Sequence, residues 1–313
     1  MSTPSGGSGE FLFIEWLWKQ VKPSSMVSTG IGDDAAVVST GRGDLLLTID
    51  TVVEGVDFES GKATPKEVGR KAVAASLSDI AAMGGVADYV LVSAATGEKF
   101  GRAAMEGLYR GMAEVCREVS VDLVGGDLAS GSKSLVVTVA SVGHVPEGKR
   151  AILRKGARVG DAIMVTGELG GSLLGKHLAF RPRLREAAIL TDICTPTSMI
   201  DVSDGLLLDL SHILEESGVG ALLHEEAIPV SPAAEELARR TGSSPMDHAL
   251  SDGEDYELLF TVAGEDVSKL TQGEPLGVGV SRIGEVTAEG LRMRRRSGET
   301  VSLEPRGYEH RIE

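Results

Sequence analysis

The chain has 313 residues and a formal net charge of -15, with 42% hydrophobic and 25% charged residues. One core rarely serves a chain of this size, so two domains are expected, and the composition is that of an ordinary globular protein. The acidic balance argues against a nucleic-acid-binding surface, which needs Lys and Arg to neutralise phosphates.

No apolar run approaches the roughly 20 residues that span a bilayer, and the polar start MSTPSGGSG lacks the apolar core of a signal peptide. We therefore expect a cytoplasmic protein that contacts no membrane. Cys116 and Cys194 stand far apart without a CxxC or Cys/His pattern. This spacing favours two buried reduced thiols over a zinc site or a disulfide.

The first half of the chain is predicted to form an α/β unit. Residues 10–21 have apolar positions at helical spacing and predict an opening helix. Strands are predicted at 35–38, 45–49, 89–94, 121–124 and 134–142, and helices at 65–83 and 101–118. The mixture of alternating and continuous apolar runs predicts a largely antiparallel or mixed sheet with helices on one face.

Residues 144–161 are rich in Gly and cations and predict a passage between two domains, which we place at 1–147 and 148–313. The cations of this segment are typical of a solvated linker. Arg154 could instead grip a nucleotide phosphate at the domain junction, and both interpretations stay open.

The second half is predicted to start with a strand at 162–166. Gly170, Gly175 and Lys176 then fit the pattern G-x-x-x-x-G-K of a phosphate-binding loop, but His177 stands where that loop needs Ser or Thr. We therefore interpret this segment as a helix that starts at a glycine.

Residues 199–202 predict another strand, which runs into Ser203-Asp204-Gly205 and a helix from Leu206. Ser203 or Asp204 can cap that helix, which is the structural interpretation. Backbone N–H groups at such a junction can also bind phosphate, and the two roles are compatible.

Aspartates recur beside Gly, Ser or Thr at the ends of apolar segments, where a short side chain can reach a shared site without disturbing the interior. They stand in GIGDDAAVV (residues 30–38), LLLTID, SLSDIAAMG, VDLVGGD and IDVSDGL: Asp33, Asp34, Asp50, Asp79, Asp127, Asp201 and Asp204. Any single Asp-Gly is commonly just a turn. The set, rich in oxygen and poor in nitrogen, predicts a Mg²⁺ site.

The motifs GIGDDAAV, TIDTVVEGVDF, ASLSDIAAMG, VGGD, IDVSDGL and SDGEDYEL, in this order over nearly the whole chain, resemble the thiamine-monophosphate kinase family. Its superfamily includes aminoimidazole ribonucleotide synthetase (PurM), selenophosphate synthetase and the hydrogenase maturation factor HypE. The resemblance implies an α/β (α+β) fold with a two-domain PurM-like architecture. Its N-terminal mixed sheet with helices would bind ATP and Mg²⁺ and form a homodimer through the sheet, and an α/β domain would follow.

The resemblance also implies that the γ-phosphoryl group of ATP is transferred to thiamine monophosphate, which gives thiamine diphosphate. Several Mg²⁺ ions would be held by Asp34, Thr48, Ile49 (through its backbone), Asp50, Asp79, Asp127, Asp201 and Asp204. ATP would be contacted by Tyr109, Gly126, Asp127, Arg154 and Ser203. The thiamine substrate would be contacted by Asp57, Glu254 and Tyr308.

No further catalytic residue is expected, because the attacking phosphate oxygen is already ionised at neutral pH and needs no general base. The required stabilisation is electrostatic and positional, and metal ions that bridge the phosphoryl oxygens supply it.

Asp57 departs from the family pattern, which usually reads VEGVHF with the His touching substrate. A carboxylate there would repel an anionic acceptor unless a metal or water intervenes. Alternatively, Asp57 turns away to solvent and another group covers the role.

Two other functions stay open. One is a different ATP-using enzyme of the superfamily, and the other is a non-catalytic protein that binds Mg²⁺ or a nucleotide. Selenophosphate synthetases normally carry a reactive Cys near the N-terminus and HypE relatives end in a modifiable Cys. This chain has no Cys before Cys116 and ends in His310-Arg311-Ile312-Glu313.

Overall fold

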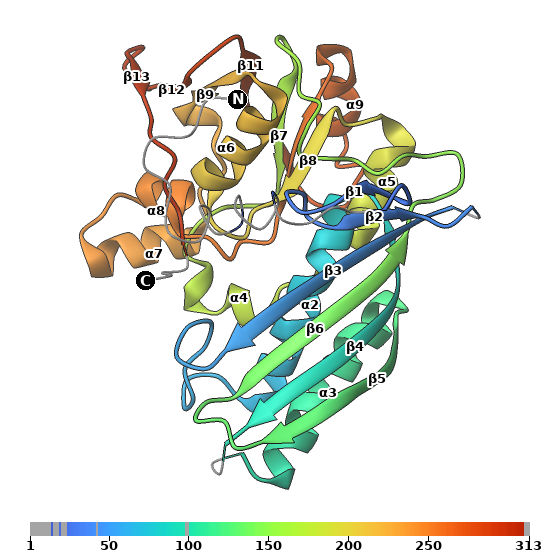
Figure 1. Cartoon of the computed structure of the whole chain (residues 1–313). Coiled ribbons are helices and arrows are strands. Elements are labelled where there is room, and N and C mark those ends of the chain that lie inside the picture. The colour runs from blue at the N-terminus through green and yellow to red at the C-terminus, as the bar shows by residue number, and fades with distance from the viewer. Residues whose placement is uncertain (1–13, 15–18, 20–23, 42, 98–99, 310–313) are drawn as a thin grey trace.

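The computed structural model describes residues 14, 19, 24–41, 43–97 and 100–309, which form two sheets with helices around them (Figure 1). The helix predicted over 10–21 lies outside the described residues except for Ile14 and Lys19, which are both helical. The structure has two α/β units, as the sequence predicts, and the sheet of the first unit is mixed as predicted.

The first sheet has six strands in the order β1-β2-β3-β6-β4-β5, and only β4 and β5 pair in parallel. Its strands are β1 (Val27–Thr29), β2 (Ala36–Ser39), β3 (Asp44–Val53), β4 (Val86–Thr96), β5 (Asp122–Ser130) and β6 (Val136–His144). The mixed sheet predicted from the apolar pattern is therefore confirmed.

Helices α2 (Pro65–Ala82) and α3 (Arg102–Val119) cover one face of this sheet. Thr64 caps α2 in a capping box with Glu67, and Pro65 occupies the first turn, where no N–H is needed. The two helices approach closely because glycines stand at the contact: a Cβ on Gly111 would lie 1.9 Å from the carbonyl oxygen of Lys66.

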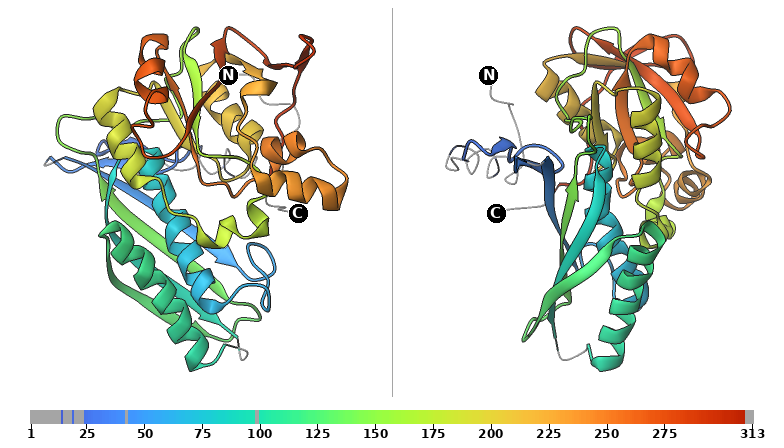
Figure 2. Two further views of the ribbon diagram at one scale, coloured as in Figure 1. Left: turned by 180° about the vertical axis from the view of Figure 1, so that it is seen from behind. Right: turned by 90° about the vertical axis from the view of Figure 1, so that its right-hand side faces the viewer.

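The opposite face of the first sheet is apolar and uncovered. Seen edge-on, the sheet has α2 and α3 on one side, and no described helix packs on most of the other (Figure 2). Large apolar side chains alternate outward along β3, β4 and β5, and they are Leu47, Ile49, Leu91, Val124 and Leu128. A continuous apolar surface of this kind is typical of an interface.

The second sheet has seven strands in the order β13-β12-β9-β11-β7-β10-β8, with only β12 and β9 parallel. Its strands are β7 (Ala162–Thr166), β8 (Ser198–Asp201), β9 (Gly220–His224), β10 (Leu258–Val262), β11 (Val280–Thr287), β12 (Leu291–Arg294) and β13 (Thr300–Ser302). Every residue of β7, β8 and β10 is buried, because apolar side chains pack on both faces of the sheet.

Helices and single turns surround this second sheet. They are η1 (Ser172–Leu174), α4 (Lys176–Ala179), α5 (Leu184–Ile193), α6 (Leu206–Ser217), η2 (Glu225–Ala227), α7 (Pro232–Thr241), α8 (Pro245–Ser251), η3 (Gly264–Asp266) and α9 (Val267–Thr271). Within the part of the chain that the structure describes, no helix is long and apolar enough to cross a membrane. Cys116 and Cys194 are buried and free, as expected.

Helix α2 joins the two units. One side packs on the first sheet, and the other contacts α4, α5 and β8 of the second unit. Thirteen of its residues are buried, including the cation Lys71. Polar side chains of α2 can therefore reach groups from both units.

Candidate active site

Carboxylates from both units meet near the C-terminal end of α2. Asp34 just before β2, Asp79 on α2 and Asp201 at the end of β8 each place an oxygen within 4.8 Å of the others. Asp50 of β3 adjoins Asp79, and its Oδ2 is buried with no hydrogen-bond partner among the described residues. We call these four residues the acidic cluster.

Neighbouring donors fix the orientation of the acidic cluster. Thr48 Oγ1 donates to Asp79 at 2.5 Å, and Ser78 Oγ donates to Asp201 at 2.6 Å. Arg154 Nη2 donates to Asp34 Oδ1 at 2.9 Å. Since hydrogen bonds to carboxylates are among the stronger ones in proteins, these aspartates are held in defined positions.

The acidic cluster is electrostatically strained. Burial first, and then repulsion by neighbouring carboxylates, raises the pKa of Asp79 well above its usual range, and burial likewise raises the pKa of Asp50 and Asp201. Burial and repulsion by Asp34 raise the pKa of the adjoining Asp33 to about 7. So many carboxylates cannot all ionise together unless cations are close by.

The pleat of β3 decides which of its predicted residues face the acidic cluster. Thr48 and Asp50 share the face toward α2, and the side chain of Ile49 points the other way and is 67% exposed. The side chain of Ile49 therefore points away from the acidic cluster, and only its backbone lies between Thr48 and Asp50.

The turn Ser203–Gly205 joins β8 to α6 beside Asp201. The prediction that Ser203 or Asp204 caps α6 is wrong: the N-cap residue is Gly205, which has no side chain to accept a hydrogen bond from the N–H groups of the first turn. Instead Asp209, one turn into the helix, accepts from the N–H groups of Asp204 at 3.1 Å and Gly205 at 2.9 Å. Gly205 has a φ of 124°, a backbone conformation that glycine adopts readily and residues with a side chain rarely do.

Two residues predicted to contact the thiamine substrate, Glu254 and Tyr308, lie beside the turn Ser203–Gly205. The N–H of Glu254 donates to the carbonyl of Ser203 at 2.6 Å, and the N–H of Tyr308 donates to the carbonyl of Asp204 at 2.9 Å. Both residues are therefore tied by backbone bonds to the turn that follows Asp201. The structure thus brings the predicted acceptor residues Glu254 and Tyr308 next to predicted metal and ATP ligands.

Asp57 belongs to the turn after β3, and its carboxylate is already engaged there. Its Oδ2 accepts from the N–H of Val53 at 2.7 Å, and its carbonyl accepts from Lys71 Nζ at 2.7 Å. The side chain of Asp57 therefore braces its own turn instead of extending into solvent.

Three of the residues predicted to bind ATP lie away from the acidic cluster within one chain: Gly126, Asp127 and Tyr109. Asp50, Val139, Val92 and Gly126 form a lateral row across the first sheet, so Gly126 lies three strand spacings, roughly 14 Å, from Asp50. Asp127 is next to it on the same edge strand and is exposed.

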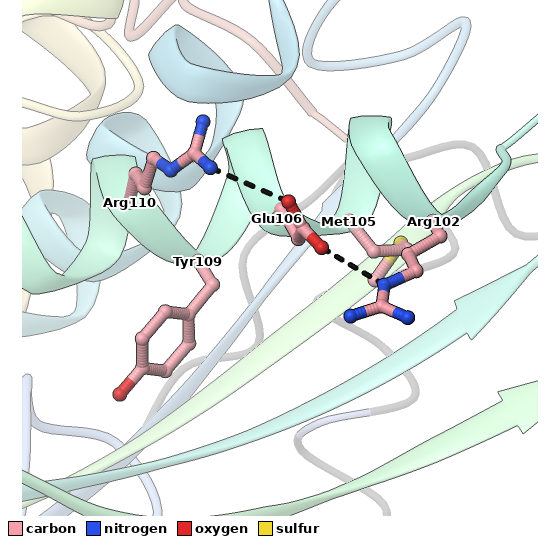
Figure 3. A pocket seen from close by; sticks show the side chains of 5 residues that line it. All are labelled: Arg102, Met105, Glu106, Tyr109 and Arg110. Carbon is pink, nitrogen blue, oxygen red and sulfur yellow. Dashed lines mark hydrogen bonds and ion pairs between the residues drawn. The ribbon is translucent and has the colours of Figure 1, made fainter.

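Tyr109 is the third of these residues. Leu108 of α3 packs at Gly69 of α2, which is about 15 Å along the helix from Asp79. Tyr109 is 55% exposed and lines a hollow of about 320 Å³ with Arg102, Met105, Glu106 and Arg110. In Figure 3, Glu106 bridges the two arginines and the Tyr109 ring projects away from that row.

Lys176, the cation of the near-match to a phosphate-binding loop, has a structural partner. Its Nζ pairs with the buried carboxylate of Glu257 at 2.8 Å and donates to the carbonyl of Glu168 at 3.1 Å. Gly175 has a φ of 140° and separates η1 from α4. The interpretation as one glycine-started helix holds only in part: two short helical pieces, η1 and α4, each follow a glycine.

Sequence reasoning missed several residues beside the site. Lys71 and Ser78 precede Asp79 at helical spacing, and such polar positions inside an apolar helix were a usable signal. Tyr256 is buried and stacks on Phe180 with ring centroids 3.9 Å apart. No local pattern marks Tyr256, because its partner belongs to a distant segment.

Comparisons with known proteins agree with this architecture. The family model described as AIR synthase related protein, N-terminal domain, matches residues 32–145, and the C-terminal domain model of the same description matches residues 163–294. The fold and the acidic cluster thus define a two-domain protein of the AIR synthase (PurM) related superfamily.

Sequence relatives narrow the family further. The chain is 38% identical to the thiamine-monophosphate kinase of Rhodopirellula baltica over 307 residues, covering 95% of this chain and 96% of that protein. It is 32% identical to the Bacillus subtilis thiamine-monophosphate kinase, covering 96% and 99%. The chain belongs to the thiamine-monophosphate kinase family.

Solved structures are similar over almost the whole chain. AaThiL complexed with AMPPCP and TMP matches with a TM-score of 0.83 at 30% identity, covering 99% of both chains. The Escherichia coli hydrogenase maturation protein HypE matches with a TM-score of 0.72 at 21% identity, covering 96% of this chain and 98% of that one. That second likeness shows the fold alone.

Proposed function

We propose that this chain transfers the γ-phosphoryl group of ATP to the phosphate of thiamine monophosphate and so forms thiamine diphosphate, the last step of that compound's biosynthesis. The observation that carries the proposal is the acidic cluster, to which both units contribute carboxylates, in a chain of the thiamine-monophosphate kinase family. A structural neighbour, AaThiL, is complexed with AMPPCP and TMP, which supports ATP as the phosphoryl donor and thiamine monophosphate as the acceptor.

The residues present fit several Mg²⁺ ions. The acidic cluster offers carboxylate oxygens only, one of them buried without a partner, and oxygen ligands are those that Mg²⁺ prefers. Bound there, Mg²⁺ would neutralise charge on the phosphates as the new bond forms. The ligands there would be Asp34, Asp50, Asp79, Asp201, Thr48, the backbone of Ile49 and Asp204. Asp127 would be a metal ligand on the family resemblance alone, because it lies on β5 apart from the acidic cluster within one chain.

The protein groups bind and orient the two polyanions. Arg154 is held by Asp34 at the edge of the acidic cluster, where its guanidinium can pair with an ATP phosphate. Asp209 fixes the turn that carries Ser203 and Asp204. Since the acceptor oxygen is already ionised, this positioning and charge stabilisation are sufficient without a general base.

The remaining assignments are made on the family resemblance. Tyr109 and Gly126, with Asp127, would contact ATP, and Asp57, Glu254 and Tyr308 would contact the acceptor. Two copies would pair through the uncovered apolar face of the first sheet. Sedimentation of the purified protein tests this pairing, and a monomer at micromolar concentration would contradict it.

The boundary between an N-terminal ATP- and Mg²⁺-binding domain and a C-terminal domain is placed at residues 147/148, between β6 and β7. Limited proteolysis tests it, because the exposed backbone between domains is cut before packed strands are.

The function itself is tested by incubating the protein with ATP, MgCl₂ and thiamine monophosphate. Chromatography is expected to show thiamine diphosphate and ADP in equal amounts, with no product when a chelator removes the metal. Absence of thiamine diphosphate with all components present would leave a non-catalytic nucleotide-binding protein as the better description.

A further inference from the structure

Lys71 is a buried cation on the face of α2 that points toward the second unit. Its side chain is only 1% exposed, although an ammonium group is costly to bury unless it is paired. Ser78 and Asp79 follow at positions i+7 and i+8, so all three side chains lie on one face of the helix.

The contacts of Lys71 join two segments that the sequence keeps far apart. Its Nζ donates to both carboxylate oxygens of Glu254 at 2.6 Å and to the carbonyl oxygen of Asp57 at 2.7 Å. An ammonium group has only three N–H donors, and these three contacts employ all of them. Lys71 therefore fixes the turn after β3 and the loop before β10 at the same time.

The loop that carries Glu254 is held in an uncommon conformation. Glu254 has a φ of 55° and Tyr256 a φ of 51°, and both lie in the left-handed region that non-glycine residues rarely adopt. Such geometry persists only where surrounding contacts over-determine it. The bidentate pair with Lys71 is one such contact, and the backbone bond from Glu254 to Ser203 is another.

The spacing along α2 matches an acceptor with two chemically different ends. Lys71 lies seven residues before Ser78, which is about 10 Å along a helix. Ser78 and Asp79 belong to the phosphate end of the proposed reaction, at the acidic cluster. Glu254 would contact the other end, so a single rigid helix sets the distance between the two.

We propose that Lys71 is a positioning residue for the acceptor. Lys71 aligns Glu254 and the Asp57 turn with the acidic cluster, so that a bound thiamine monophosphate places its phosphate at the cluster. The inference rests on the proposed function, because it takes Glu254 and Asp57 as acceptor contacts. Lys71 also offsets the negative charge of Glu254, which would otherwise act on an anionic acceptor.

The test compares Lys71→Met with wild type in steady-state kinetics, with thiamine monophosphate and ATP varied in turn. Met retains most of the side-chain volume and removes the charge. We expect KM for thiamine monophosphate to rise at least about tenfold, and KM for ATP to stay within about threefold. Lys66→Met is the matched control: it lies on the same helix but pairs with Glu114 near the surface, and both constants should stay at the wild-type values.

A merely structural ion pair would behave differently. It would lower the thermal midpoint and alter both Michaelis constants in parallel, or neither. An unchanged KM for thiamine monophosphate in Lys71→Met, or a parallel rise in both Michaelis constants, overturns the inference about Lys71. The proposed function still stands in that case, provided that the wild type forms thiamine diphosphate. Failure of the wild type to form thiamine diphosphate overturns the proposed function instead.

If Lys71→Met does not fold, the pair Lys71→Met with Glu254→Gln replaces it, because that variant leaves no unpaired buried charge. The pair is compared with Glu254→Gln alone, because Glu254 is itself taken as an acceptor contact. A KM for thiamine monophosphate clearly higher in the pair than in Glu254→Gln, with KM for ATP unchanged, supports the inference, and equal constants in the two variants overturn it.

Discussion

Asp79 shows how a single residue can serve both architecture and chemistry. It stands near the C-terminal end of helix α2, accepts from Thr48, and has a carboxylate oxygen within 4.8 Å of oxygens of Asp34 and Asp201. Helix α2 would tolerate an amide at this position, since Asn keeps the shape and the acceptor oxygen. The negative charge is what the proposed metal site requires.

We therefore expect Asp79→Asn and Asp50→Asn each to lower kcat at least about a hundredfold at saturating Mg²⁺, because losing a metal ligand removes charge stabilisation in the transition state. Asp192→Asn is the control, since Asp192 is exposed and pairs only with Lys149. Near-normal turnover in either cluster variant, with an intact circular dichroism spectrum, would contradict the metal assignment.

Asp57 is the residue at which this chain departs from the family pattern, and the structure sharpens its test. Asp57→Asn keeps the bond to the Val53 N–H and removes only the charge. Because a carboxylate near an anionic acceptor repels it, KM for thiamine monophosphate should fall by roughly threefold, an effect below about 1 kcal/mol. Glu59→Gln removes an exposed charge two residues away and should have no effect. A KM for Asp57→Asn that stays constant or rises would show that Asp57 does not weaken acceptor binding.

At the scale of elements, local signals were sufficient for helix α2. The sequence predicts a helix over 65–83 and the structure has Pro65–Ala82, because the capping box, the first-turn proline and the apolar pattern are all encoded within that segment. Strand ends were less accurate: 45–49 was predicted for β3, which spans Asp44–Val53. Its polar residues Thr48, Asp50 and Thr51 obscure the alternation that extends it.

The contact between α2 and α3 depends on glycines. On Gly111 a Cβ would lie 1.9 Å from a backbone carbonyl oxygen, whereas on Gly107, in the same helix, the nearest atom would be 3.4 Å away. We expect Gly111→Ala to reduce the free energy of unfolding by about 1–3 kcal/mol through overpacking. Gly107→Ala should be neutral or stabilising by up to about 1 kcal/mol, because alanine favours helix. Urea unfolding of both variants measures this, and equal stabilities would mean that the helices separate at no cost.

At the scale of the whole molecule, the sequence predicted which aspartates matter but not how they are held. Ser78 meets Asp201 across 123 residues, and Lys71 meets Glu254 across 183. No local pattern specifies such pairs, since they exist only once both sheets have packed on α2. The positions of Tyr109, Gly126 and Asp127 apart from the acidic cluster could not be anticipated either, because motif order says nothing about strand order.

The charge of the acidic cluster links the stability of the whole molecule to pH. A carboxylate whose folded pKa is raised keeps its proton where the unfolded chain has lost it. Between about pH 4 and pH 7 the folded state therefore binds more protons, and stability falls as pH rises. Asp33, with a pKa raised to about 7 from 3.8, follows this sign. Burial lowers the pKa of His212 to about 4, which gives the opposite slope, so total stability alone does not isolate the cluster.

The change in stability on adding Mg²⁺ does isolate the acidic cluster, because the contribution of His212 is the same with and without metal. Metal binding needs deprotonated carboxylates, so the rise in thermal midpoint on replacing EDTA by millimolar MgCl₂ should be several degrees at about pH 7.5 and should nearly vanish at about pH 5. Differential scanning fluorimetry at both pH values measures it, and in Asp201→Asn the rise at about pH 7.5 should shrink markedly. An equal rise in thermal midpoint at both pH values, or a rise that Asp201→Asn leaves intact, would place the metal away from these buried carboxylates. The reason is that only groups that still hold protons at about pH 5 make Mg²⁺ binding depend on pH in this window.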